Sequence, residues 1–158
     1  MKLLYVAAVC LFMTGLVQAQ GTWKTDNTHS NVKFTATHLV VSEVEGYFKV
    51  FDGTVKTTRA DFGDATIQFS ADVNSINTDN EMRDKHLKSD DFFNAEKYPQ
   101  MTFTSTSFKK TGANKYVLTG NLTIRDVTKK VTFDVTYGGT IKDPWGNTKA
   151  GFRAKGKI

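Results

Sequence analysis

Apolar and polar residues alternate along most of this chain. Val32, Phe34 and Ala36 alternate with Lys, Thr and Thr. A period of two places apolar side chains on one face of a strand and polar ones on the other. The same period recurs in segments 67–73, 116–124 and 131–137. Turn-forming residues separate these runs at 112–114, 125–126, 138–139 and 143–147. The pattern predicts an all-β, antiparallel domain, either a sandwich or a barrel.

One stretch, at about residues 78–95, departs from this alternation. Thr78 followed three residues later by Glu81 is a capping-box pattern, which predicts a helix with Thr78 as its cap. Ser89 resembles a second cap that opens a short turn, and Pro99 ends any helical structure before the next strand. Inserts of this length are typical of lids or binding loops, so we expect a short helical insert in the β domain.

The first 19 residues have the composition of a secretory signal peptide. Lys2 supplies a positive start, an apolar run follows, and Val17 and Ala19 supply the small residues of a cleavage site. Cleavage after Ala19 removes Cys10, the only cysteine, and leaves a single domain over residues 20–158. We therefore expect a periplasmic protein without a disulfide.

Charge and aromatic content narrow the function classes. The formal net charge is +5, and the basic residues are scattered singly rather than clustered. The chain contains 12 Phe, 5 Tyr and 2 Trp, and most of these Phe fall at apolar alternation positions. Inward-pointing rings argue against a nucleic-acid stacking surface. They can fill a solid core or line a long cavity, and periodicity does not decide between the two.

The candidates for chemistry are few. His29, His38 and His86 do not have the spacing of a zinc site. No Gly-x-Ser-x-Gly sequence is present, and the nearness of Asp26, His29 and Ser30 in sequence does not define a triad; we expect a turn there, with His29 bonded to the backbone. We expect no catalytic residue, no metal and no cofactor.

Several motifs spread over the chain resemble the YceI-like family of exported lipid-binding proteins. The most specific are Arg83-Asp84-Lys85-His86-Leu87 and Asp91-Phe92-Phe93 at their mutual spacing. The further segments that carry the resemblance are Trp23 with Asp26 and His29-Ser30, Val32-x-Phe34, His38, Gly46-x-Phe48, Phe51-x-Gly53, Ser75-Ile76-Asn77-Thr78, Tyr98-Pro99, Phe103-x-Ser105, Gly120 to Arg125, and Val127-Thr128-Lys129.

This resemblance implies a lipocalin-like barrel with a helical insert and an apolar tunnel. The implied ligand is a polyisoprenoid or similar long-chain amphiphilic lipid, held by a periplasmic carrier that forms dimers and contacts membranes transiently. Similar proteins continue beyond Ile158 with a last strand that helps close the barrel, so we expect the C-terminal strand to be incomplete here.

The predicted ligand contacts follow from this interpretation. The tail is expected to touch inward-facing positions, the insert is expected to gate one end, and two polar residues are expected at the head group. The tail residues are Phe34, Phe48, Phe69, Phe103, Leu118, Leu122 and Phe133; the gate residues are Met82, Leu87, Phe92 and Phe93; the head-group residues are His38 and Arg83. The alternatives are a small exported isomerase or hydrolase that uses His38 or His86, and a stress-response module with a filled core and no ligand.

Overall fold

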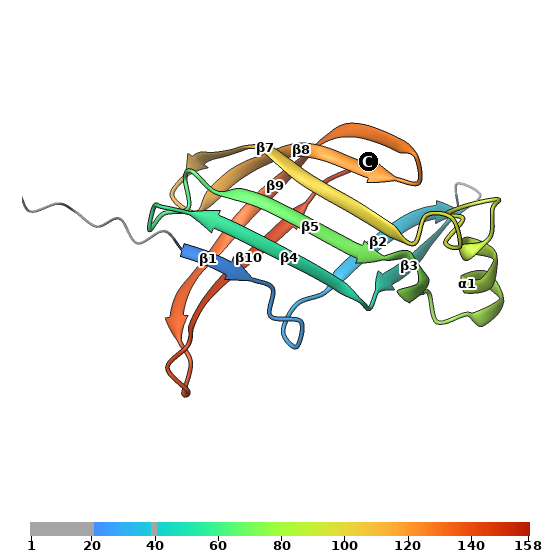
Figure 1. Ribbon diagram of the computed structural model, residues 1–158, viewed down its shortest axis with the longest axis horizontal. Coiled ribbons are helices and arrows are strands. Elements are labelled where there is room, and N and C mark those ends of the chain that lie inside the picture. The colour runs from blue at the N-terminus through green and yellow to red at the C-terminus, as the bar shows by residue number, and fades with distance from the viewer. Residues whose placement is uncertain (1–20, 39–40) are drawn as a thin grey trace, which may run out of the picture.

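The computed structural model describes residues 21–38 and 41–158, and within these ranges the fold is almost entirely β (Figure 1). One α-helix, one 3-10 helix and ten strands make up the described part. The strands are β1 (Gly21–Lys24), β2 (Val32–His38), β3 (Ser42–Phe48), β4 (Phe51–Thr57), β5 (Thr66–Asp72), β6 (Ile76–Asn77), β7 (Gln100–Gly112), β8 (Lys115–Ile124), β9 (Val127–Lys142) and β10 (Thr148–Lys155); the helices are η1 (Val73–Ser75) and α1 (Glu81–Lys88).

Two antiparallel sheets form the body of the molecule. Seven strands pair in the order β1-β4-β5-β7-β8-β9-β10, and three pair in the order β2-β3-β6. The large sheet curls, so that β9 and β10 lie behind β1, β4 and β5 in Figure 1. The prediction of an all-β antiparallel fold with a helical insert is therefore confirmed, with the large sheet forming a half-barrel.

The strands follow the alternation of the sequence. On β9, Val131, Phe133 and Val135 pack into the interior, while the intervening residues are largely exposed. The turn predicted at Gly138-Gly139 is wrong. β9 continues through both glycines, and the positive φ of Gly139 accompanies a shift in the β9–β10 register instead of a chain reversal.

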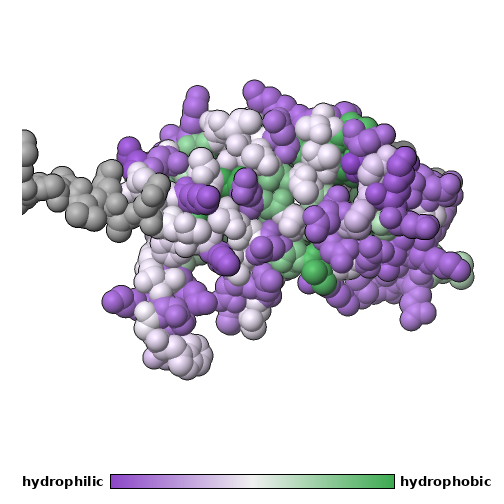
Figure 2. Space-filling view, viewed as in Figure 1, coloured by the Kyte–Doolittle hydropathy of each residue, from purple (hydrophilic) through white to green (hydrophobic). Residues whose placement is uncertain are grey.

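The helical insert begins later than the sequence predicts. Asn80 is the N-cap of α1, with its side chain accepting a hydrogen bond from the Arg83 amide at 3.0 Å, so the assignment of Thr78 as the cap is wrong. The helix ends at Lys88, and the hydroxyl of its C-cap, Ser89, donates to the His86 carbonyl at 2.7 Å. Hydrophilic residues dominate the surface of this end of the molecule (Figure 2). Within the described residues, no helix is both long and apolar enough to span a bilayer.

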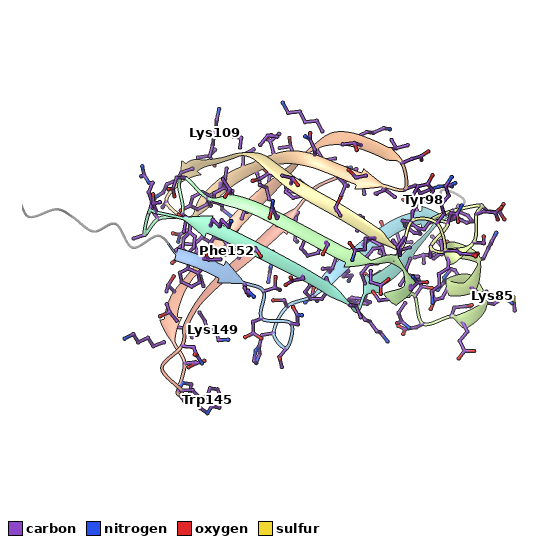
Figure 3. All side chains as sticks on the ribbon, viewed as in Figure 1. Lys85, Tyr98, Lys109, Trp145, Lys149 and Phe152 are labelled. Carbon is purple, nitrogen blue, oxygen red and sulfur yellow. The ribbon has the colours of Figure 1, made fainter. Side chains whose placement is uncertain are left out.

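Side chains, not backbone pairing, hold the two outer edges of the large sheet together. The ring of Phe62 lies 5.3 Å from that of Trp23 on β1 and 5.0 Å from that of Phe152 on β10. The Lys149 ammonium on β10 contacts the Asp26 carboxylate, just after β1, at 2.8 Å. Figure 3 labels Lys149 and Phe152 on this strand. The half-barrel is thus closed at this end by one aromatic cluster and one ion pair.

Candidate functional site

The concave face of the curled sheet is the candidate site, because it carries a continuous apolar lining. Its buried residues, together with residues of the small sheet, the β4–β5 loop and the insert, form two clusters. Phe69 and Leu122 pack against both clusters, so the two are joined. The first comprises Phe48, Phe51, Ala71, Val73, Ile76, Ala95 and Met101; the second comprises Phe62, Ala65, Phe103, Phe108, Tyr116, Leu118 and Val135.

The structure brings all seven predicted tail residues into this lining. Phe48, Phe103 and Leu118 are buried, whereas Phe34, Phe69, Leu122 and Phe133 are half-buried and pack at the edges of the clusters. Among the described residues, no large side chain is fully buried. The four half-buried members leave part of the lining accessible to solvent.

The rings contact one another in local pairs along this lining. Phe34 lies 5.6 Å from Phe48, and Phe103 lies 5.7 Å from Phe133. These are favourable aromatic separations. Two rings also lie over glycines, where a β-carbon would collide with them. The ring of Phe34 covers Gly46 across the β2–β3 pair, and the ring of Phe103 covers Gly120 across the β7–β8 region.

The predicted gate residues on the insert divide into two groups. Leu87 and Phe93 pack against the first cluster, with the Phe93 ring 6.0 Å from Phe48 and nearly perpendicular to it. Phe92 stays exposed and makes an edge contact with His86, and Met82 is 83% exposed. Leu87 and Phe93 therefore reach the lining, while Met82 and Phe92 face away from it.

The predicted head-group residues also separate. Arg83 bonds within the insert, because its Nε donates to the Thr78 hydroxyl at 2.8 Å and a terminal nitrogen donates to the Thr78 carbonyl at 2.7 Å. The buried Asp84 carboxylate accepts from the Thr78 amide and hydroxyl at 2.9 and 2.6 Å. This network ties α1 to the end of β6. His38 ends β2, and its side chain lies outside the part described.

Histidine meets carboxylate in two places. His86 Nε2 lies 3.1 Å from Asp91, and His29 Nδ1 lies 3.1 Å from Asp26, both in exposed surroundings. The predicted turn is present, since the His29 amide donates to the Asp26 carbonyl at 3.1 Å, and the His29 ring contacts the Asp26 carboxylate instead of the backbone. Hydrogen bonds from Lys149 and then from His29 lower the pKa of Asp26 to about 2.

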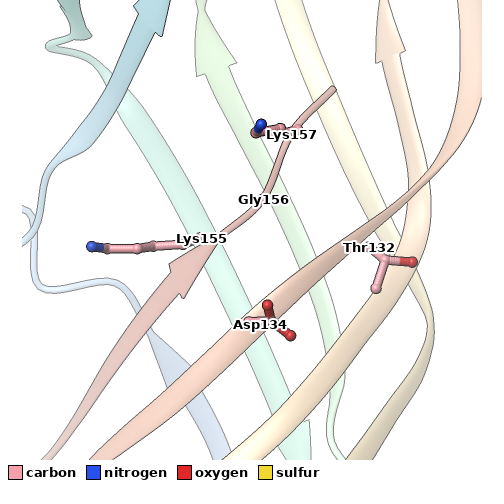
Figure 4. Close-up of a pocket in the computed structure, with 5 residues that line it drawn as sticks. All are labelled: Thr132, Asp134, Lys155, Gly156 and Lys157. Carbon is pink, nitrogen blue, oxygen red and sulfur yellow. The ribbon is translucent and has the colours of Figure 1, made fainter.

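Two open hollows on the described structure lie largely apart from the apolar lining, and the second shares only Ile76 with it. One, of about 420 Å³, is lined by polar residues of β9 and β10 and the segment after them; Figure 4 shows the Lys155 side chain extending away from Asp134. The other, of about 330 Å³, lies beside α1. Neither includes a histidine. Within residues 21–38 and 41–158, no group of three or more potential metal ligands is found.

Sequence reasoning missed several residues that line the site or hold its surroundings in place. Phe62 has a left-handed backbone in the β4–β5 loop, where no alternation identifies it. Tyr116 donates its hydroxyl to the Asp61 carbonyl at 2.6 Å, which fixes this loop over the second cluster. Arg125 donates to the carbonyls of Asp90 and Phe92 at 3.1 and 2.8 Å, tying the β8–β9 turn to the insert. Two sequence features could have identified them: Phe62 is an isolated aromatic residue in a polar loop, and Arg125 is a lone arginine in a turn.

Comparison with known proteins places these features in a family. The model of the YceI-like domain matches residues 23–158. Protein YceI of Salmonella newport (strain SL254) is 42% identical over 155 residues, which is 98% of this chain and 81% of the relative.

Solved structures agree with this match. The Campylobacter jejuni YCEI protein is 36% identical with a TM-score of 0.67, over 85% of this chain and 78% of the other. Burkholderia cenocepacia BcnA is 33% identical with a TM-score of 0.67, over 72% and 71% of the respective chains. On the family-model match, the sequence identity and the structural likeness, this chain belongs to the YceI-like family.

Proposed function

We propose that this chain is an exported carrier that holds a long apolar lipid along the concave face of its curled sheet, without acting on it chemically. The observation that carries the proposal is the continuous apolar lining, in which half-buried Phe69 and Leu122 join two clusters. Membership of the YceI-like family supports the ligand class named above, a polyisoprenoid or similar long-chain amphiphile.

A lining of this kind suits exchange with a membrane. A lipid tail in a bilayer is already out of water, so its transfer to an apolar surface changes its free energy little. Water-to-protein transfer at ~0.8 kcal/mol per CH₂ would instead give a chain of tens of carbons an affinity beyond any observed limit. Reversible loading therefore follows from the bilayer being the reference state.

The insert supplies one end of the proposed site. Leu87 and Phe93 contact the first cluster, and the bonds of Arg83 and Asp84 to Thr78 hold the helix that carries Leu87. We assign Arg83 to this anchoring, and His38, whose side chain lies outside the described part, stays the predicted contact of the polar head group. Displacement of Phe93 from Phe48 would uncover the apolar lining at this end.

Organic-solvent extraction of the purified protein, followed by mass spectrometry, tests the proposal. We expect a long-chain lipid in about equimolar amount, and a marked loss of it in Leu122→Trp, which adds a bulky ring where the two clusters meet. Val50→Trp, a substitution of the same kind at an exposed position, should retain the lipid. Protein that carries no lipid after expression in several hosts would refute the proposal.

Export is part of the proposal. Residues 1–19 lie outside the described part of the structure, and their composition indicates a signal peptide cleaved after Ala19. N-terminal sequencing of protein recovered from the periplasm should begin at Gln20. Recovery of the uncleaved chain in the cytoplasm would contradict this localisation.

A further inference from the structure

The hairpin that joins β9 and β10 projects from the body of the molecule and carries an exposed tryptophan. Figure 1 shows the hairpin leaving the sheet, and Figure 3 labels Trp145 at its tip. Trp145 is 83% exposed, and Ile141 on the same hairpin is 67% exposed. In Figure 2 the tip is a pale projection beside the hydrophilic sides of the molecule. A large aromatic side chain held this far into solvent contributes nothing to the packing of the fold.

The turn that presents Trp145 is built rigidly. The Asp143 carboxylate accepts hydrogen bonds from the backbone amides of Trp145 and Asn147 at 3.0 and 2.8 Å and from the Asn147 side chain at 2.9 Å. The Asp143 amide donates to the Asn147 carbonyl at 2.9 Å, and the Gly146 amide donates to the Asp143 carbonyl at 3.0 Å. The backbone is therefore fixed before any contact is made, which lowers the entropy cost of binding.

The base of the hairpin is fixed as well. Lys149 is the cross-strand neighbour of Ile141 and forms its ion pair with Asp26 at 2.8 Å. The Asp143 carboxylate is directed into the turn, and the preceding residue, Lys142, is exposed. The formal net charge of +5 falls to +4 when Lys2 leaves with the proposed signal peptide, so the exported protein remains positive. The hairpin thus combines an apolar tip with a neighbouring lysine, on a molecule whose net charge is positive.

We propose that this hairpin docks the protein on an anionic bilayer by placing Trp145 and Ile141 in the interfacial region. Tryptophan is enriched at membrane–water interfaces, where its ring lies at the level of the head groups. A narrow convex tip offers far less area than the 1,200–2,000 Å² or so of a specific protein interface, whereas a fluid interface needs no matching pocket. Net positive charge adds attraction to anionic lipid.

The proposal deepens the carrier function and rests on it for its physiological role, because docking would serve the exchange of a lipid. The contact between hairpin and membrane does not itself depend on that function. Docking by the hairpin would hold the protein at the membrane while the lipid passes between bilayer and lining. The contact is weak and reversible, because one ring and one aliphatic side chain bury little apolar area.

Co-sedimentation with vesicles tests the docking. Wild-type protein should bind phosphatidylcholine vesicles that contain phosphatidylglycerol, more weakly without the anionic lipid, and its tryptophan emission should shift to shorter wavelength. Trp145→Ala should lower the partition coefficient about tenfold and abolish the shift, because interfacial binding scales with buried apolar area. Trp145→Tyr should retain much of the binding, since tyrosine shares the interfacial preference. Val50→Ala, at another exposed apolar position, should bind as wild type does.

The outcomes separate this inference from the carrier function. Equal vesicle binding by wild type and Trp145→Ala, or no binding by either, would overturn the docking proposal. Dimerisation that depends on Trp145 in analytical ultracentrifugation, without vesicle binding, would also overturn it in favour of a second copy as partner. Lipid extraction from Trp145→Ala reports on carriage alone: lipid retained without docking preserves the proposed function, and docking without lipid in the wild type refutes only the proposed function.

Discussion

Phe48 joins the small sheet, the interior lining and the insert, so its truncation tests how these parts depend on one another. Its side chain is 4% exposed and belongs to the first cluster. Its ring contacts Phe34 on β2 at 5.6 Å and Phe93 after α1 at 6.0 Å. Phe48→Ala removes both ring contacts and leaves a cavity between the insert and the sheet.

The expected cost follows from these contacts. Burial of a Phe side chain contributes about 1.5–3 kcal/mol, and each aromatic pair adds about 0.5–1.5 kcal/mol. We therefore expect Phe48→Ala to lower the free energy of unfolding by about 4 kcal/mol, inside the usual range for Phe→Ala in a core. Phe48→Leu keeps most of the burial and loses both ring pairs, so its loss should be about 1–3 kcal/mol.

Urea denaturation followed by circular dichroism measures these losses. Val50→Ala, two residues away but 59% exposed, should change the free energy of unfolding by less than about 0.5 kcal/mol. Amide exchange should also rise in the insert of Phe48→Ala more than in β7–β9, since Phe93 loses its partner. A loss below about 1.5 kcal/mol for Phe48→Ala would refute the reasoning, because it would mean that the surroundings of the ring are not closely packed.

Three further predictions concern the helical insert, two glycines of the large sheet, and the ion pair between Asp26 and Lys149. Asp84→Ala removes the acceptor of two buried hydrogen bonds and should destabilise the protein by about 1–3 kcal/mol in urea denaturation; a neutral result would contradict the anchoring of α1. Gly120→Ala should cost about 1–3 kcal/mol, because its β-carbon meets an aromatic ring and a carbonyl, whereas Gly112→Ala has room and should be nearly neutral by the same assay. The folded-state pKa of Asp26 is depressed from 3.8 to about 2, so its pairing stabilises the fold above pH 4 or so and is lost as the pH falls through about 2. The difference in melting temperature between wild type and Asp26→Asn should therefore shrink between pH 5 and pH 2 or so, and a constant difference would contradict the pairing with Lys149.

The strands could be predicted from local sequence, because the alternation of apolar and polar residues indicates which face of a strand is buried. The helix was also evident, although its start was misplaced by two residues. Both Thr78 and Asn80 can cap a helix, and Thr78 is instead engaged by Asp84 and Arg83. Gly139 was predicted to lie in a turn because glycine readily adopts a positive φ. A bulge inside a long strand uses the same backbone conformation.

Contacts between residues far apart in the sequence could not be predicted from the alternation of apolar and polar residues. Lys149 and Asp26 are 123 residues apart in sequence, and nothing local indicates that β1 and β10 meet. The residues that face the lining were evident from alternation, yet the extent to which they cover one another depends on sheet curvature. Whether Phe69 and Leu122 are half-buried or fully packed is set by how far the sheet curls, which no stretch of the sequence specifies.

The edge-to-edge closure of the large sheet has a mechanical consequence. A barrel whose first and last strands are hydrogen-bonded has a circumference fixed by its ladder, and widening it breaks backbone bonds. Here the two edge strands are joined instead by the ring of Phe62, which lies between Trp23 and Phe152, and by one ion pair. Small displacements of these contacts would change the width of the curled sheet while every backbone ladder within it stays intact, so the space along its concave face can vary without loss of strand pairing.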